Sequence, residues 1–272
     1  MKQAPASIDD LIVEIKDPCH LSAKEHAAML ERCQRTNMVI YAAQQRTASK
    51  EMARLIGQQF GLERLDANLL ANEDGISEIT VSAASDITQP TYIPYTNRPI
   101  KWHTDGYYNT PTRRVRGMVL HCVHSATEGG ENHLMDHEIA YIRLRDANPD
   151  FIRALCEPDA MTIPERIDEN GVARAAQSGP VFSVDENGKL HMRYTARTRS
   201  IAWQQDEMTL TAVAYLEQLL ATDSPHIYTA RLESGMGLLC NNVLHDRSGF
   251  TDNFASPRLL YRARYFDRIT GT

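Results

Sequence analysis

The spacing of hydrophobic and polar residues predicts a chain of many short strands, accompanied by a few helices. Compact apolar runs and period-two alternation, both typical of strands, occur at 11–15, 38–42, 79–82, 116–123, 237–247 and 257–266. Apolar residues spaced three or four positions apart, as on one face of a helix, occur at 23–34, 49–60, 136–160 and 206–221. A mainly β fold with flanking helices is therefore expected.

Local signals mark where several of these elements begin and end. Ser22 followed by Glu25 forms a capping box, which starts a helix, and Asn37 is expected to end that helix. Asn187-Gly188 separates two apolar runs and predicts a β-hairpin. The stretch 68–99 is polar and rich in turn residues; it is either a surface loop or part of the lining of a substrate pocket.

Length and charge narrow the class of protein. With 272 residues, the chain suits a single large domain over 1–272, with the helical stretch 136–160 as an insertion. The net charge of −6 argues against a nucleic acid or an anionic membrane as partner, because binding their phosphate groups needs a basic surface. The expected partner is a small-molecule substrate, and formation of a homo-oligomer is left open.

Cysteine usage bears on the cellular compartment. The five cysteines are odd in number and scattered, and none forms a C-x-x-C pair, which indicates free thiols in a reducing environment. The first residues lack the apolar core of a signal peptide, and no apolar run is long enough to span a bilayer. A cytoplasmic protein is therefore expected.

The stretch around His103-Thr104-Asp105-Gly106 carries the first candidate chemistry. Alternate side chains of an extended segment point the same way, so His103 and Asp105 offer an imidazole nitrogen and a carboxylate oxygen to one side. Gly106 then allows the chain to turn. These are two of the three ligands of a 2-His-1-carboxylate site for Fe(II), although a single His-x-Asp among ten histidines is weak evidence.

The end of the chain supplies the missing groups. The apolar run at 237–247 reads as a buried strand that ends in His245, and Arg258 begins the following strand. A guanidinium is permanently charged and matches a carboxylate through two parallel hydrogen bonds. A third ligand followed by such an arginine suits a site that binds a metal ion and a dicarboxylate together.

His103-x-Asp105, His245 and Arg258, taken in this order, resemble the Fe(II)/2-oxoglutarate-dependent dioxygenases of the taurine dioxygenase superfamily, which includes γ-butyrobetaine hydroxylase-like enzymes. The resemblance covers about 100–266. It implies a double-stranded β-helix (jelly-roll) core and a hydroxylase that uses Fe(II), 2-oxoglutarate and O2 and releases succinate and CO2. It also implies iron bound by His103, Asp105 and His245, with Arg258 on the far carboxylate of 2-oxoglutarate.

The same resemblance assigns roles to further positions. A threonine that contacts 2-oxoglutarate in the family is replaced here by Asn132, whose amide can donate a hydrogen bond instead. Arg262 matches an arginine that contacts anionic substrates. Apart from the resemblance, Arg197 and Tyr107 are candidate substrate contacts by residue type and position, with a solvated arginine and a core tyrosine as the alternatives. The expected substrate is small and anionic.

Other readings have less support. His133 and His137, like His121 and His124, have spacings seen in metal sites, but they lack the remaining residues of any known motif. No nucleophile elbow, Walker loop or dinucleotide-binding fingerprint is present. A non-catalytic sensor that binds metal and 2-oxoglutarate on the same barrel remains the alternative function.

Overall fold

The computed structural model describes residues 7–45, 48–67, 74–81, 93–168, 171–199, 201–253 and 256–272, without the side chains of 168 and 171–173. Two parts of the turn-rich stretch, 68–73 and 82–92, lie outside the described residues. Contacts divide the chain into two compact units. The first comprises Met1–Ile100, Val115–Leu134 and Tyr228–Thr272; the second comprises Lys101–Arg114 and Met135–Ile227. The single domain expected over the whole chain stays a prediction.

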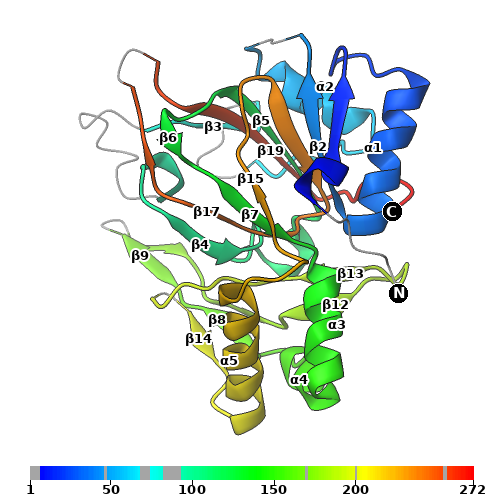
Figure 1. Cartoon of the computed structure of the whole chain (residues 1–272). Coiled ribbons are helices and arrows are strands. Elements are labelled where there is room, and N and C mark those ends of the chain that lie inside the picture. Colours follow the sequence, from blue (N-terminus) through cyan, green and yellow to red (C-terminus); the bar gives the residue numbers. More distant parts are fainter. Residues whose placement is uncertain are drawn as a thin grey trace. The chain divides into compact units, whose positions relative to one another are not determined.

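The first unit is built on a six-stranded sheet (Figure 1). β1 runs parallel to β2, while β16 is antiparallel to both β2 and β5, and β19 to both β5 and β3. In spatial order the strands are β1 (Ile12–Ile15), β2 (Met38–Ala43), β16 (Met236–Cys240), β5 (Gly117–His124), β19 (Leu259–Tyr265) and β3 (Ile76–Ile79).

Two helices cover one face of this sheet: α1 (Ala23–Thr36) contacts β1 and β2, and α2 (Glu51–Gln58) contacts β5 and β19. The predicted capping box starts α1, since the Ser22 side chain accepts a hydrogen bond from Glu25 N and the Glu25 carboxylate accepts one from Ser22 N. Asn37 ends it in the left-handed conformation (φ 60°). Buried apolar side chains from both helices form a core with this face of the sheet.

The other face of the six-stranded sheet packs against strands of a second sheet, whose order is β15-β7-β17-β4. Leu134 and Tyr228 from this second sheet share a buried cluster with Met118 and Leu238 of the first. Two facing sheets are expected of a jelly roll. The four strands are β15 (Tyr228–Ala230), β7 (Asn132–Met135), β17 (Leu244–Arg247) and β4 (Ile100–His103). β6 (Glu128–Gly129) and β18 (Phe250–Thr251) form a separate two-stranded sheet.

One predicted strand is misplaced. The expected strand at 79–82 contains only Ile79, and β3 instead begins at Ile76, directly after Gly75 in a positive-φ conformation. The partner strand β19 sets the bounds of β3, because the two strands pair only from Ile76, opposite Ala263, to Ile79, opposite Leu260. Ser82 lies outside the described residues.

The run at 237–247 is also not one strand. It divides into β16 and β17, which belong to different sheets, with Asn241–Val243 between them. Asn242 adopts a left-handed conformation (φ 49°), and its side chain donates to Val115 O at 2.7 Å. Asparagine tolerates this conformation better than most residues, so it breaks an otherwise apolar run. His245 is consequently the second residue of a new strand.

The second unit combines three helices with several small sheets (Figure 1). α3 (His137–Ala147), α4 (Pro149–Leu155) and α5 (Glu207–Ala221) pack together, which confirms the helices predicted at 136–160 and 206–221. The strands are β8 (Met161–Ile163), β9 (Arg166–Asp168), β10 (Gly171–Arg174), β11 (Gln177–Gly179), β12 (Phe182–Val184), β13 (Leu190–Met192) and β14 (Ala202–Trp203).

The hairpin predicted at Asn187-Gly188 is confirmed between β12 and β13. Its turn is longer than two residues, because Asp185 accepts hydrogen bonds from the backbone N–H groups of Asn187, Gly188 and Lys189. Three single-turn helices complete the described elements: η1 (Ile8–Leu11), η2 (Ile93–Tyr95) and η3 (Pro111–Arg113). No helix in the described part of the chain has the length and apolar character needed to cross a membrane.

Candidate metal centre

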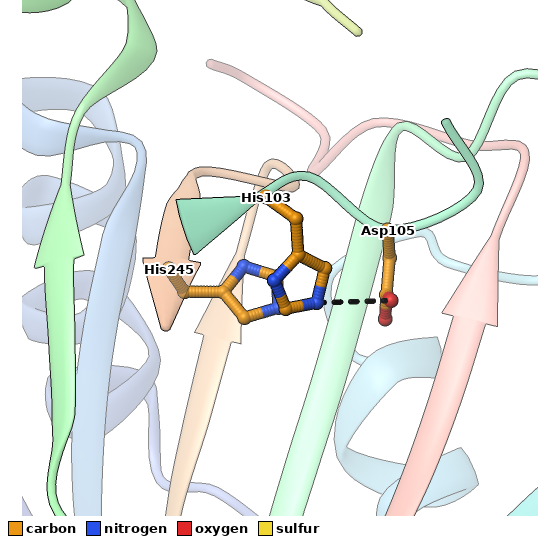
Figure 2. Close-up of side chains that lie close together, drawn as sticks. All are labelled: His103, Asp105 and His245. Atoms are coloured by element: carbon orange, nitrogen blue, oxygen red, sulfur yellow. Dashed lines mark ion pairs between the residues drawn. The ribbon is translucent and has the colours of Figure 1, made fainter. Parts of the chain in front are cut away.

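His103, Asp105 and His245 come together at neighbouring strands. His103 ends β4, Asp105 follows two residues later, and His245 lies in β17, which is next to β4 in the second sheet. Each offers one ligand atom, and these atoms all lie within 4.8 Å of one another (Figure 2). All three residues are buried, and His103 Nε2 lies 3.9 Å from Asp105 Oδ1. No other such group of three or more is found among the described residues.

The backbone around the His-x-Asp motif is held by a neighbouring segment. Thr104 N donates to Tyr194 O at 3.0 Å, and Tyr194 N donates back to the Thr104 hydroxyl at 3.1 Å. Gly106, at φ 70°, then turns the chain away. These bonds hold the backbone where β4 ends and the turn at Asp105 begins. The two candidate ligands meet on one side of this segment, with His103 Nε2 3.9 Å from Asp105 Oδ1.

Hydrogen bonds orient the two imidazole rings in the same way. Nδ1 of His103 lies 2.9 Å from Lys101 O, and Nδ1 of His245 lies 2.9 Å from Val243 O. A carbonyl oxygen only accepts hydrogen bonds, so each Nδ1 is the protonated donor and Nε2 carries the lone pair. Metal-binding histidines are typically oriented by such a second hydrogen bond. Two oriented imidazoles and one carboxylate fit a divalent iron ion.

Arg258 is a buried cation directly before β19. Its backbone N–H donates to both carboxylate oxygens of Asp252, at 2.9 and 2.7 Å. Its guanidinium stacks over Phe250, with Cζ 5.0 Å from the ring centroid. Burial lowers the pKa of Arg258, partly offset by Cys122 and Asp252. Across the described residues, no side chain forms an ion pair with this guanidinium.

Arg247 lies on the same aromatic ring and was not singled out from the sequence. Its Cζ is 4.9 Å from the Phe250 centroid, and its guanidinium donates to the carbonyl oxygens of Pro94, Thr96 and Arg98 at 2.6–3.2 Å. It thus ties β17, two residues after His245, to the segment that leads into β4. Burial, and to a smaller extent the charge of Arg258, lowers the pKa of Arg247 to about 9.

Asn132 lies in β7 beside β17. Its Nδ2 donates to Asp246 O at 2.5 Å, so part of the amide's donor capacity connects the two strands. Its buried Oδ1 has no hydrogen-bond partner in the described part of the chain. The predicted contact of Asn132 with 2-oxoglutarate stays a prediction, as does the substrate contact of Arg262, which lies in β19 opposite Ser77 and Leu120.

Tyr107 and Arg197 lie near the His-x-Asp motif. Tyr107 is buried and meets His103 edge-on, with ring centroids 6.5 Å apart. Arg197 is exposed, and its Cζ lies 5.7 Å from the Tyr107 centroid. Burial raises the pKa of Tyr107, while Arg197 acts in the opposite direction. Their predicted role in substrate binding is thus compatible with their positions but stays a prediction.

Comparisons with known proteins agree with this geometry. The sequence matches the family described as "Taurine catabolism dioxygenase TauD, TfdA family" over residues 5–264. A uridine-5'-phosphate dioxygenase from Amycolatopsis sp. is 34% identical over 173 residues, which is 60% of this chain and only 60% of that relative. Another uridine-5'-phosphate dioxygenase, from Streptomyces sp., is 28% identical over 228 residues, covering 79% of this chain and 78% of the relative.

A solved structure shows the same fold. It is the non-heme iron oxygenase OrfP in complex with Fe and alpha-ketoglutaric acid, 14% identical, with a TM-score of 0.62 over 89% of this chain and 81% of the other. The predicted double-stranded β-helix core with flanking helices is thereby confirmed. Because the family match extends over nearly its whole length, the chain belongs to the taurine catabolism dioxygenase TauD, TfdA family.

Proposed function

We propose that the protein is a non-haem Fe(II)- and 2-oxoglutarate-dependent dioxygenase that hydroxylates a small anionic substrate. The observation that carries this proposal is the group formed by His103, Asp105 and His245, with both imidazoles oriented so that Nε2 carries the lone pair. The family and the iron-containing structural neighbour support the same reaction class.

His103 and His245 would bind the iron through Nε2, and Asp105 through its carboxylate. Fe(II) bound with 2-oxoglutarate supplies O2 activation, which converts the cosubstrate into succinate and CO2 and oxidises the substrate. The residues described above provide orientation: the carbonyl oxygens of Lys101 and Val243 hold the imidazoles. The Thr104–Tyr194 hydrogen bonds hold the strand end that positions Asp105.

Arg258 would bind the far carboxylate of 2-oxoglutarate. A guanidinium buried without an acidic partner is costly, and a dicarboxylate would supply the missing charge. The Phe250 ring fixes one face of the guanidinium while leaving its hydrogen-bonding edge for a ligand.

Uridine 5′-phosphate is the first substrate to test, because two relatives carry its name and a phosphate monoester fits an anionic substrate. The chain aligns with only 60% of the first relative, so the substrate is a proposal. We also propose a cytoplasmic location; the five free thiols support it, because free thiols are usual in a reducing compartment.

An anaerobic titration with Fe(II) and 2-oxoglutarate tests the proposal. The wild-type protein is expected to develop a visible metal-to-ligand charge-transfer band and, with O2 and substrate, to release succinate. His103→Ala and His245→Ala should lose iron retention, the band and succinate release. His20→Ala is the matched control, because that side chain is exposed and pairs only with Asp17 in the described structure. Full succinate release by either triad variant would refute the assignment.

A further inference from the structure

A group of arginines surrounds Tyr107 in the second unit. Arg193 donates to four backbone carbonyls, those of Tyr107, Met161, Gly179 and Gln177, at 2.7–3.3 Å. It thereby joins the turn after Asp105 to β8 and β11. These partners are neutral, so the charge of Arg193 is spread over carbonyl dipoles and not cancelled.

Arg174 is the second member. One of its nitrogens, Nη2, donates to Pro164 O at 2.7 Å. A second nitrogen, Nη1, is buried and has no hydrogen-bond partner in the part of the chain that the structure describes. Leaving a charged donor buried and unsatisfied is unfavourable, and an acceptor oxygen of a ligand would satisfy it.

The strand pairing around Arg174 adds a second, independent observation. Across the antiparallel pair β9–β10, Arg174 lies directly opposite Arg166. Two guanidinium groups thus come from neighbouring strand positions. Burial lowers the pKa of Arg174, the neighbouring tyrosines act against this, and Arg166 lowers it further. Burial, together with the charges of Arg114 and Arg174, lowers the pKa of Arg193 to about 10.

Arg197 completes the group from the solvent side. It is exposed, and its Cζ lies 5.7 Å from the ring of Tyr107, which itself meets the ring of His103 edge-on. Within the described residues, none of Arg174, Arg193 and Arg197 forms an ion pair with an acidic side chain. In a chain with a net charge of −6, so many uncompensated cations beside the candidate metal ligands form a local positive field that attracts anions.

We propose that Arg174 and Arg197 bind the phosphate group of a nucleoside monophosphate substrate, with Arg193 holding the neighbouring turn in place. The proposal rests on the proposed function and adds to it the group that recognises the substrate's charge. Guanidinium is suited to this, since its paired donors match phosphate oxygens. Arg174 supplies the buried donor Nη1, and Arg197 supplies an exposed cation on the solvent side.

Binding of uridine 5′-phosphate, uridine and inorganic phosphate by the full-length chain tests this site, measured anaerobically with and without Fe(II) and 2-oxoglutarate. Arg174→Gln and Arg197→Gln should each raise the Kd for uridine 5′-phosphate by about ten- to a hundredfold, as expected for a charge-assisted hydrogen bond. They should weaken phosphate binding too, and leave the Kd for uridine unchanged. Arg153→Gln is the control, because this exposed arginine of α4 pairs with Asp150.

Several outcomes would overturn the proposal. The first is that both variants bind uridine 5′-phosphate with wild-type affinity. The second is that the variants bind uridine more weakly by the same factor as uridine 5′-phosphate. The third is that the wild-type protein binds uridine as tightly as uridine 5′-phosphate. If Arg174→Gln does not fold, as judged by circular dichroism, the same measurements are made on Arg174→Lys and on Arg197→Gln, which replaces an exposed side chain.

The charge-transfer band separates this proposal from the proposed function. If the band and succinate release persist while the arginine variants bind uridine 5′-phosphate normally, the phosphate site is refuted and the dioxygenase stands. If the arginines govern phosphate binding but no band forms in the wild type, the phosphate site stands and the dioxygenase is refuted.

Discussion

At the scale of single residues, the candidate site depends on hydrogen bonds to the backbone. Both candidate histidine ligands donate from Nδ1 to a carbonyl two residues earlier in the chain. Arg247 and Arg193 are likewise held by carbonyl oxygens. Backbone acceptors are fixed once the strands have formed, so these side chains are oriented before any ligand binds, which reduces the entropic cost of binding.

Replacing Arg258 tests the binding of the cosubstrate. Arg258→Ala should raise the Kd for 2-oxoglutarate by about ten- to a hundredfold, because one charge-assisted hydrogen-bonding pair is lost. Iron content should remain at the wild-type level, since Arg258 is not a ligand candidate. The charge-transfer band, titrated with 2-oxoglutarate, measures the first quantity and metal analysis the second. If the Kd for 2-oxoglutarate does not change, another cation must bind its far carboxylate, and Arg262 is the next residue to test.

At the scale of elements, the six-stranded sheet depends on close contact between neighbouring strands. Gly237 of β16 pairs with both Tyr41 of β2 and His121 of β5. The side chains of these two partners share a buried hydrogen bond of 3.0 Å between Tyr41 Oη and His121 Nδ1. A glycine between them leaves room for the tyrosine ring.

Gly237→Ala should therefore destabilise the protein. The added Cβ would lie 2.2 Å from Tyr41 Oη and 2.6 Å from Leu120 O, so the ring or the strand must move. Overpacking of this kind costs about 1–3 kcal/mol of unfolding free energy, measured by urea denaturation. Gly249→Ala is the control, because its nearest neighbour, Asn97 O, would be 3.5 Å away. Equal stability of the two variants would contradict this account.

At the scale of the whole molecule, the end of the chain is tied to an early loop. Asp267 accepts hydrogen bonds from the backbone N–H of Glu63 and Arg64 at 2.9 and 2.6 Å, and from Arg64 Nε at 2.6 Å. Burial alone would raise the pKa of Asp267, but these hydrogen bonds lower it by more, so the net shift is below its ordinary value of 3.8.

This contact predicts a pH-dependent contribution to stability. A lowered pKa in the folded state means that the ionised carboxylate stabilises the protein above pH 3.8, and that this stabilisation is lost as the pH falls through the folded pKa. Asp267→Asn should lower the free energy of unfolding by roughly 1 kcal/mol at pH 7. The difference from wild type should shrink below pH 3.8, as measured by denaturant unfolding. A constant difference across this range would argue against the ionised contact.

Much of this protein was determined by sequence patterns that act locally. The capping box at Ser22, the end of the helix at Asn37 and the hairpin at Asn187-Gly188 formed as expected, although the turn of the hairpin is longer than two residues. Each of these features depends on hydrogen bonds within a few residues. The His-x-Asp pair could be recognised for the same reason, since the alternation of an extended strand already places both side chains on one side.

Tertiary structure decided what depends on partners distant in the sequence. Asn242 broke the run at 237–247 because its side chain bonds to Val115, and β3 ended where β19 stopped pairing. Arg193 gave no sequence signal, since its four carbonyl partners lie up to 86 residues away. Likewise, the approach of His245 to His103 follows from β17 lying beside β4 in one sheet. Contacts of this kind form only when strands pair, and no local pattern encodes them.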